Sequence, residues 1–491
     1  MKNDLERTDF GNIESETKDP MKISVFEKSA YGFGDMASCL FWQTFTMFLL
    51  FFYTDIFGIS AKAAGTMFLI VRIIDICFDP FIGMFADRTK SRFGRFRSWI
   101  LYGMVPFGVL GFLMFLSPDW ATSAKLVYAY ITYTAMMIVY SIVNIPYGAL
   151  IGVITSDTAD RTSLAAYRAI FAFLGGGVVQ LFTLPLVKYF GLLKSVDGTT
   201  VNEQFGWATA MGIYAVLAII MFSVTVFGTK ERVQPIQEEN TSLGRDVKDL
   251  FRNTPWILLT LVGILTCLFT TLRNGTIMYY FKYYVRMEGS ANLFGFEVGS
   301  EVLVSTFMFA GTVFSIVGTM MLRPIAVWLG KKNTYIVSMA LGTVSSVAYY
   351  FLSPHQITEM FVLQVVSNFA VGPAMAMMWS MYADTADYSE YKTGRRATGL
   401  IFSSASSGQK LGWAFGGWIT GIMLAAYGFV ANVEPSAETQ SGIVYLFSFI
   451  PITASLLAIV VLFFYKLDEK TVHYITQELA RIKDEKEITN E

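Results

Sequence analysis

The chain has 491 residues, of which 54% are hydrophobic and only 15% are charged, with 37 Lys and Arg against 38 Asp and Glu. Soluble domains carry about 25% charged residues, so this composition predicts a polytopic membrane protein and excludes a soluble protein with a single membrane tail. The net charge of −1 gives no indication of nucleic-acid binding.

Apolar segments follow one another through nearly the whole chain. The first 30 residues are polar and contain no signal peptide, so the first apolar span is expected to direct insertion. Segments of about 20 apolar residues are long enough to cross a bilayer as helices. Twelve such segments cover residues 33–57, 63–86, 98–117, 123–154, 165–190, 207–228, 256–285, 303–322, 332–352, 357–383, 398–426 and 441–465. The sequence therefore predicts an all-α membrane protein with twelve transmembrane helices.

The distribution of Lys and Arg predicts the orientation of these spans. With the N-terminus in the cytoplasm, 28 of the 37 basic residues fall in cytoplasmic segments and 6 in outer loops. Because basic residues mark the cytoplasmic side, we expect a multi-pass protein of the cytoplasmic (inner) membrane with both termini in the cytoplasm.

Two short matches indicate an internal repeat. Asp157-Thr-Ala-Asp160 follows span four and Asp384-Thr-Ala-Asp387 follows span ten, 227 positions later, while Gly94-Arg95 and Gly330-Lys331 lie 236 positions apart. Duplicated six-helix units place a substrate site between the halves near the midplane. The expected division is a cytoplasmic segment 1–30, a bundle 31–228, a cytoplasmic loop 229–254, a bundle 255–465 and a cytoplasmic tail 466–491.

The second span carries three charges on one helix face. Arg72, Asp75 and Asp79 fall at i, i+3 and i+7, and a charge at the centre of a membrane helix costs about 2.5–3.5 kcal/mol. They must therefore face inward, and we interpret Asp75 and Asp79 as cation ligands. The alternative is a buried salt-bridge cluster that only fixes helix packing. Lys410, well inside span eleven, is expected to lie close to both acids and to couple cation occupancy to rearrangement.

Polar side chains in other spans are candidates for binding substrate. The amide of Asn144 suits pairs of sugar hydroxyls, although an ordinary interhelical hydrogen bond is an alternative. Arg273 has no acidic neighbour in its own helix, so we expect a partner such as Asp35 or an anionic ligand. The candidates are Gln43, Arg72, Tyr140, Asn144, Arg168, Arg273, Trp379, Ser406 and Gln409.

Two densely charged segments follow spans two and ten. We interpret them as ionic latches of a cytoplasmic gate. The alternatives are plain positive-inside topology for the first and a solvated charged loop for the second. The gate candidates are Asp87, Arg88, Arg95, Asp384, Asp387, Glu390 and Arg396.

These motifs, in this order and spacing, resemble a known family. They are Arg72-x-x-Asp75-x-x-x-Asp79-Pro80, the loop 87–97, Asn144-Ile-Pro-Tyr147, the run 383–392 and Gln409-Lys410. From about Tyr31 to the tail, the chain resembles the glycoside–pentoside–hexuronide:cation symporter family of the major facilitator superfamily. The resemblance implies a major facilitator fold of two pseudo-symmetric six-helix bundles. It also implies a cation site of Asp75, Asp79, Ser141 and Lys410, and a cytoplasmic lock of Asp387, Glu390 and Arg396.

The chain departs from the sugar site of the family's best-known member. Cys39 and Asn144 stand where that site has carboxylates, and Gly148 stands where it has a tryptophan, whereas Arg168 matches its arginine. Two carboxylates are lost there, and a buried cation, Arg273, is present in the chain. We expect such a site to tolerate a neutral glycoside and to favour an anionic one such as a hexuronide.

We therefore predict a secondary active transporter, a monomer in the lipid bilayer that couples uptake of a glycoside, pentoside or hexuronide to Na⁺ or H⁺ by alternating access. It needs no other cofactor. The alternatives are a Na⁺-dependent lysolipid carrier of the same fold and, from a different class, a non-transporting membrane solute sensor. The three cysteines, Cys39, Cys77 and Cys267, lie in apolar spans, so we expect free thiols. The sequence contains no recognisable nucleophile–base pair. An enzyme is not predicted.

Overall fold

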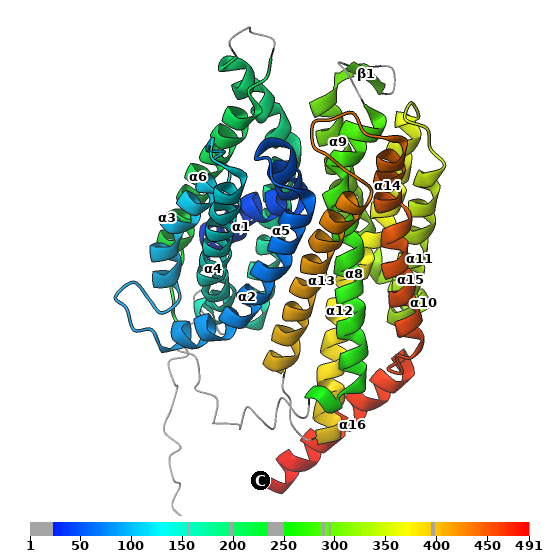
Figure 1. Cartoon of the computed structure of the whole chain (residues 1–491). Coiled ribbons are helices and arrows are strands. Elements are labelled where there is room, and N and C mark those ends of the chain that lie inside the picture. Colours follow the sequence, from blue (N-terminus) through cyan, green and yellow to red (C-terminus); the bar gives the residue numbers. More distant parts are fainter. Residues whose placement is uncertain are drawn as a thin grey trace, which may run out of the picture.

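The computed structural model describes residues 23–155, 157–195, 200–233, 250–286, 290–293, 296–393 and 398–490, and these are almost entirely helical (Figure 1). Most of the expected N-terminal segment 1–30 and of the loop 229–254 therefore lies outside the described residues. The helices gather into two groups that stand side by side, one from each half of the chain.

The amino-terminal group contains six helices, the first of which ends in a π-helical turn, η1. They are α1 (Val25–Phe51) with η1 (Phe52–Ile56), α2 (Ala61–Arg88), α3 (Arg97–Leu113), α4 (Thr122–Ile154), α5 (Thr158–Leu193) and α6 (Glu203–Gly228). Polar side chains cap the starts of four of them, α1, α2, α5 and α6. For example, Ser24 Oγ accepts from the Glu27 amide at 3.2 Å, and Asp157 accepts from the amides of Ala159 and Asp160.

The carboxyl-terminal group repeats this plan, and its first helix also ends in a π-helical turn. Its helices are α8 (Thr254–Tyr279) with η2 (Tyr280–Val285), α9 (Ser300–Met320), the short α10 (Leu322–Leu329), α11 (Lys331–Tyr350), α12 (Ile357–Thr393), α13 (Thr398–Ala426), α14 (Ala437–Phe447) and α15 (Phe449–Phe463). An antiparallel hairpin, β1 (Ser290–Leu293) and β2 (Phe296–Gly299), pairs Ser290 with Gly299 before α9. Helix α16 (Glu469–Asn490) follows the last span.

Each of the twelve predicted spans coincides with a helix in the described part of the chain. Eight are long and apolar enough to cross a membrane on those criteria alone, counting α14 and α15 as one span. The other four are α3, which is shorter, and α2, α11 and α13, which carry more polar side chains. The main differences are at helix ends: α1 starts at Val25 rather than residue 33, α12 runs on to Thr393 rather than 383, and the last span breaks at Ser448.

The backbone supports part of the predicted repeat. Gly94 and Gly330 both have positive φ, +105° and +81°, at the turns that follow α2 and α10, a conformation that favours glycine. The Asp-Thr-Ala-Asp pair differs between the halves, because Asp157 caps the start of α5 whereas Asp384 lies inside α12.

The two groups meet along three helix pairs, α2 with α13, α5 with α9 and α1 with α8. Glycines allow α2 and α13 to touch backbone to backbone. A Cβ on Gly65 would lie 3.1 Å from the Cα of Gly421, and a Cβ on Gly421 would lie 2.4 Å from the carbonyl oxygen of Ala61. Because the two helices approach so closely, polar residues about three turns away on each of them, Asp75 of α2 and Lys410 of α13, come into contact.

Candidate functional site

The charged face of α2 forms a buried cluster with α4 and α13. The side chain of Asp75 is fully buried and accepts three bonds: from Ser141 Oγ of α4 at 2.8 Å, from Lys410 Nζ of α13 at 3.1 Å and from Arg72 Nη1 at 3.4 Å. Lys410 also donates to Asp79 Oδ2. The expected proximity of Lys410 to both aspartates across the halves is confirmed, so a single ammonium ties α13 to two carboxylates on α2.

One oxygen of this cluster lacks a partner. Asp79 Oδ1 is buried and has no hydrogen-bond partner among the described residues. Such an atom carries the full cost of losing water, and a second carboxylate and a hydroxyl lie nearby. Oxygen ligands of this kind suit a hard cation. These donors are all oxygens, so a hard cation or a proton fits the site better than a transition metal, which favours nitrogen or sulfur ligands.

The charges of the cluster are balanced in pairs. Arg72 and Lys410 offset Asp75 and Asp79, and the guanidinium of Arg72 also lies over the indole ring of Trp42, 4.6 Å from its centroid. Buried charges that are fully paired are tolerated, whereas removing one partner is strongly destabilising, by about 3–5 kcal/mol. A cation that enters this cluster must therefore displace or share the role of Lys410.

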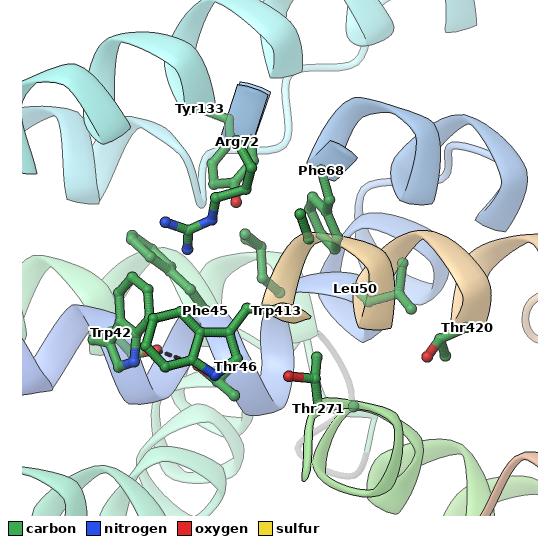
Figure 2. Close-up of a pocket in the computed structure, with 14 residues that line it drawn as sticks. Trp42, Phe45, Thr46, Leu50, Phe68, Arg72, Tyr133, Thr271, Trp413 and Thr420 are labelled. Carbon is green, nitrogen blue, oxygen red and sulfur yellow. Dashed lines mark hydrogen bonds between the residues drawn. The ribbon is translucent and has the colours of Figure 1, made fainter. Parts of the chain in front are cut away.

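A small cavity lies between the halves beside this cluster (Figure 2). The indole rings of Trp42 and Trp413 meet edge to face across it, 4.8 Å apart. Its volume is about 50 Å³, room for only a few waters. It is lined by Trp42, Phe45, Thr46, Leu49, Leu50, Phe68, Arg72, Tyr133, Thr271, Gly275, Trp413, Ala414, Gly417 and Thr420. A sugar bound at this level would need the two halves to separate.

The predicted substrate residues of the amino-terminal half surround the same region. The ring of Tyr140 contacts that of Trp42 at a tilt, with centroids 5.3 Å apart, and Asn144 Nδ2 donates to the carbonyl of Tyr140 at 3.2 Å. Arg168 Nε donates to Asp35 Oδ2 at 3.1 Å, and the side chain of Gln43 lies against α5, 3.4 Å from where a Cβ on Gly176 would be. These residues converge from α1, α4 and α5 on one face.

The face of α4 that carries Asn144 opens into free space towards the 154 end of the helix. A Cβ added to Gly148 or Gly152 would meet no atom within 4 Å. Side chains along the first turns of α5, such as Ala165 and Ala169, are exposed, whereas the later glycines of the same helix are buried. The positions beside Gly148 and Gly152 are thus uncovered, whereas the close contact of α2 with α13 lies near the other end of the bundle.

The predicted residues of the carboxyl-terminal half are more dispersed. Gln409 is buried and its Nε2 has no partner among the described atoms, and it adjoins Lys410. Ser406 is exposed one turn away, and Trp379 is 37% exposed and stacks on Phe402 with centroids 5.9 Å apart. Of these three, only Gln409 presents an unsatisfied donor next to the cluster.

The structure corrects the predicted surroundings of Arg273. Its guanidinium donates to Ser346, Ser367 and Gln364, inside the carboxyl-terminal bundle. It is only 6% exposed and lies over the rings of Tyr349 and Phe447, 5.2 and 5.3 Å from their centroids. The expected partner Asp35 is bound to Arg168 instead. The central cavity is lined by Thr271 and Gly275, on another face of α8, so Arg273 is not a ligand of that cavity.

Arg273→Ala is expected to lower the melting temperature of the purified protein in detergent. The truncation empties a buried volume beside two rings, and large-to-small changes of this kind cost about 2–5 kcal/mol. Arg252→Ala is the matched control, because Arg252 is exposed and its loss should cost much less stability. Equal losses in the two variants would contradict this structural role.

Within the described part of the chain, two of the predicted cytoplasmic gate residues, Arg95 and Asp384, each bind a partner in their own half. Asp87 and Arg88 are exposed, and the backbone amide of Arg95 donates to Glu231 at 2.7 Å. Asp384 forms an ion pair with Lys331 of the same half at 2.7 Å. Asp387 and Glu390 are partly buried in α12, and Arg396 lies outside the described residues.

At the opposite end of the bundle, a polar cluster that the sequence did not predict joins the halves. Asp55 Oδ1 of η1 accepts from Lys282 Nζ of η2 at 2.8 Å and from the hydroxyl of Tyr283. Thr54 Oγ1 lies 2.8 Å from the hydroxyl of Tyr279, and Asn432 Nδ2 donates to the carbonyl of Asp55 at 2.6 Å. We call the pair Asp55–Lys282 with Tyr283 and Asn432 the η1–η2 latch.

The latch pairs equivalent positions of the repeat. Asp55 and Lys282 are 227 residues apart, the same offset that separates the two Asp-Thr-Ala-Asp motifs. Each residue lies in the π-helical turn that ends the first helix of its own half.

Comparisons with known proteins agree with this geometry. A family model described as MFS/sugar transport protein matches residues 30–469. An inner membrane symporter of Escherichia coli, YicJ, is 35% identical over 94% of this chain and 96% of its own length. The isoprimeverose transporter of Lactiplantibacillus pentosus is 33% identical (90% and 89%), and a glucuronide carrier protein homolog of E. coli is 32% identical (92% and 95%).

Solved structures show the same architecture at low sequence identity. A bacterial homolog of the human lysosomal transporter Spinster, in an inward-facing and unoccupied conformation, superposes with a TM-score of 0.69 at 13% identity, covering 92% of this chain and 99% of that one. This match establishes the fold alone. With a family model that spans nine-tenths of its length and relatives above 30% identity throughout, the chain belongs to the MFS/sugar transport protein family and is a membrane transporter with the major facilitator fold.

Proposed function

We propose that this transporter carries a glycoside, pentoside or hexuronide into the cytoplasm together with Na⁺ or H⁺. The observation that carries the proposal is the α2–α13 cluster, in which two buried carboxylates of one half are held by a lysine of the other. Relatives over 30% identical are named as a symporter, an isoprimeverose transporter and a glucuronide carrier, which supports a sugar substrate over the lysolipid alternative.

The cation acts by competing with Lys410. It takes the unpartnered Asp79 Oδ1 together with Asp75 and the hydroxyl of Ser141. The carboxylates then no longer need the ammonium, and the tie between α2 and α13 weakens. Since that tie spans the halves 31–228 and 255–465, its strength sets how freely they rock about the midplane. Cation binding is thereby converted into a change in the preferred conformation.

The sugar binds beside the cation, between the halves. Asn144, Gln409 and Gln43 supply amide donors and acceptors for hydroxyl pairs, Tyr140 and Trp42 supply aromatic faces, and Arg72 and Arg168 are the cations within reach. Arg273 gives no reason to favour an anionic substrate, because its guanidinium lies in another part of the bundle. A neutral glycoside therefore fits this site as well as a hexuronide does.

The open space beside Gly148 and Gly152 lies at the cytoplasmic end in our assignment, with both termini in the cytoplasm and a monomer as the transporting unit. In this inward-open arrangement the η1–η2 latch closes the outer side. The charged residues around α2 and α12, including Asp87, Arg88, Arg95, Asp387, Glu390 and Arg396, close the inner side when the halves rock the other way.

Uptake into proteoliposomes tests the proposal directly. A panel of neutral and acidic glycosides is offered with an inward Na⁺ gradient, with an inward H⁺ gradient and with neither. Accumulation above equilibrium of at least one sugar under one gradient only is the expected result. Binding without counterflow, or uptake that ignores both gradients for every sugar in the panel, would count against a symporter.

A further inference from the structure

A basic bay lies at one end of the amino-terminal half, where α2, α4 and α6 end and α3 begins. It encloses about 910 Å³. Six basic side chains and one acidic one line it, together with small and apolar residues. The charged lining residues are Lys90, Arg92, Arg95, Arg97, Lys230, Glu231 and Arg232.

The single acid in the bay is already used by the backbone. Glu231 accepts from the amides of Arg95, Phe96 and Arg97 at 2.7, 2.9 and 2.9 Å. These amides form the start of α3, where unsatisfied N–H groups and the helix dipole favour an anion. Glu231 therefore fixes the shape of the α2–α3 loop. Its carboxylate binds the backbone amides at the start of α3 rather than the basic side chains of the bay.

Two of the basic residues are likewise committed. Arg232 forms an ion pair with Glu27 at 2.7 Å, which raises the pKa of Arg232, and Arg97 Nε donates to the carbonyl of Val226 at 2.7 Å. By contrast, Lys90, Arg92 and Lys230 are exposed. None of these three side chains has a hydrogen-bond or ion-pair partner within the described part of the chain, so they leave an uncompensated positive charge around the bay.

An apolar groove runs from the same rim along the membrane-facing side of α3 and α4. It encloses about 540 Å³ and is lined by Trp99, Tyr102, Pro106, Val139 and Ile142. The ring of Tyr102 is 66% exposed, and Trp99 Nε1 donates to Thr89 Oγ1 at 2.8 Å. Groove and bay share Thr89, Lys90 and Ser91, so one elongated molecule can occupy both.

We propose that one anionic phospholipid of the cytoplasmic leaflet binds here, with its phosphate among Lys90, Arg92 and Lys230 and one acyl chain in the α3–α4 groove. Charge complementarity selects the headgroup, because basic pockets on the cytoplasmic side of a membrane protein recognise anionic lipids. The groove selects a molecule with a hydrocarbon tail. A tryptophan and a tyrosine at the junction lie where aromatic residues favour the membrane interface.

The bound lipid adds to the contacts by which Glu231 and Arg97 already join the start of α3 to α6 and to the residues after it. Its phosphate contacts the α2–α3 loop and the residues that follow α6, while its tail packs along α3 and α4. The lipid therefore stabilises the amino-terminal half as a unit, independently of whether the chain transports a sugar or couples to a cation.

Native mass spectrometry and thermal melting of the full-length protein in detergent test this site. Phosphatidylglycerol should remain bound and raise the melting temperature by several degrees, whereas phosphatidylcholine with the same acyl chains and glycerol 3-phosphate should do neither. Each basic side chain near an anionic surface contributes roughly tenfold or slightly less to affinity. The variant Lys90→Gln/Arg92→Gln/Lys230→Gln should therefore bind phosphatidylglycerol on the order of a hundredfold more weakly.

The control variant is Lys466→Gln, which removes an exposed basic residue after the last span and should bind like the parent. Because loss of three basic residues can disturb insertion, a salt titration of the unmodified protein gives a second test. Binding should weaken between 0.05 and 0.5 M NaCl, since exposed charges are screened over about 10 Å at 0.1 M salt. Equal stabilisation by phosphatidylcholine, full binding by the triple variant, or equal effects of glycerol 3-phosphate would each overturn the proposal.

Discussion

Asp75→Asn is expected to abolish cation-driven accumulation of substrate while the protein still reaches the membrane. The carboxylate is fully buried and accepts from Ser141, Lys410 and Arg72. The amide is neutral, so it cannot help to neutralise an entering cation, and it leaves two buried cations facing Asp79 alone. Substrate inside proteoliposomes should therefore only equilibrate with the outside under a Na⁺ or H⁺ gradient, instead of accumulating above it.

A graded variant and a control accompany this measurement. Ser141→Ala removes only the hydroxyl, and since a hydrogen bond to a charged group contributes about 1.5–3 kcal/mol, the cation concentration for half-maximal uptake should rise about tenfold or more. Asp119→Asn changes an exposed carboxylate between α3 and α4 and should leave accumulation intact. Full accumulation by Asp75→Asn would remove the carboxylate from the coupling mechanism.

Lys282→Met is expected to shift the protein away from the conformation described here. The side chain of Asp55 is fully buried and that of Lys282 is about one-third exposed. Leaving a buried carboxylate without its cation destabilises only the conformation in which the pair forms. With allowance for the exposure of Lys282, the cost is about 1–3 kcal/mol. The ratio of inward-open to outward-open protein should fall roughly ten- to hundredfold.

Thiol labelling measures this shift. Gly152→Cys, in a chain whose native cysteines are replaced, places a thiol where a Cβ meets no atom within 4 Å. A charged maleimide added to the cytoplasmic face should label it at least several-fold more slowly when Lys282→Met is also present. The control is Lys62→Met, which changes an exposed lysine at the start of α2, shortly after η1. It should leave the labelling rate unchanged. An unaltered rate with Lys282→Met would show that the latch does not bias the equilibrium.

Much of the helical architecture could be predicted from hydrophobicity and charge. Long apolar segments have few folds open to them in a membrane, so each predicted span coincides with a helix. The exact ends of the helices were harder to predict. Helix α1 begins at Val25 because Ser24 caps it and Glu27 pairs with Arg232, and α12 continues past 383 because Asp384 is buried against Lys331. Such ends depend on partners far away in the chain.

The candidate site divides in the same way. Arg72, Asp75, Asp79 and Lys410 stood out because charges are costly inside apolar spans, and the structure brings all four together. The latch did not stand out, since Asp55 and Lys282 lie at span ends, where charges are ordinary. The direction of Arg273 could not be predicted either, because its neighbours Ser346 and Ser367 are neutral and belong to α11 and α12.

The π-helical turns η1 and η2 determine whether the side chains of Asp55 and Lys282 can meet. A regular α-helix turns by about 100° per residue, so one residue more or fewer before Asp55 would swing its carboxylate to a different side of α1. The meeting of Asp55 and Lys282 is thus a matter of helical phase. A single-residue deletion in either π-helical turn would therefore break the Asp55–Lys282 ion pair although both side chains remain in the protein.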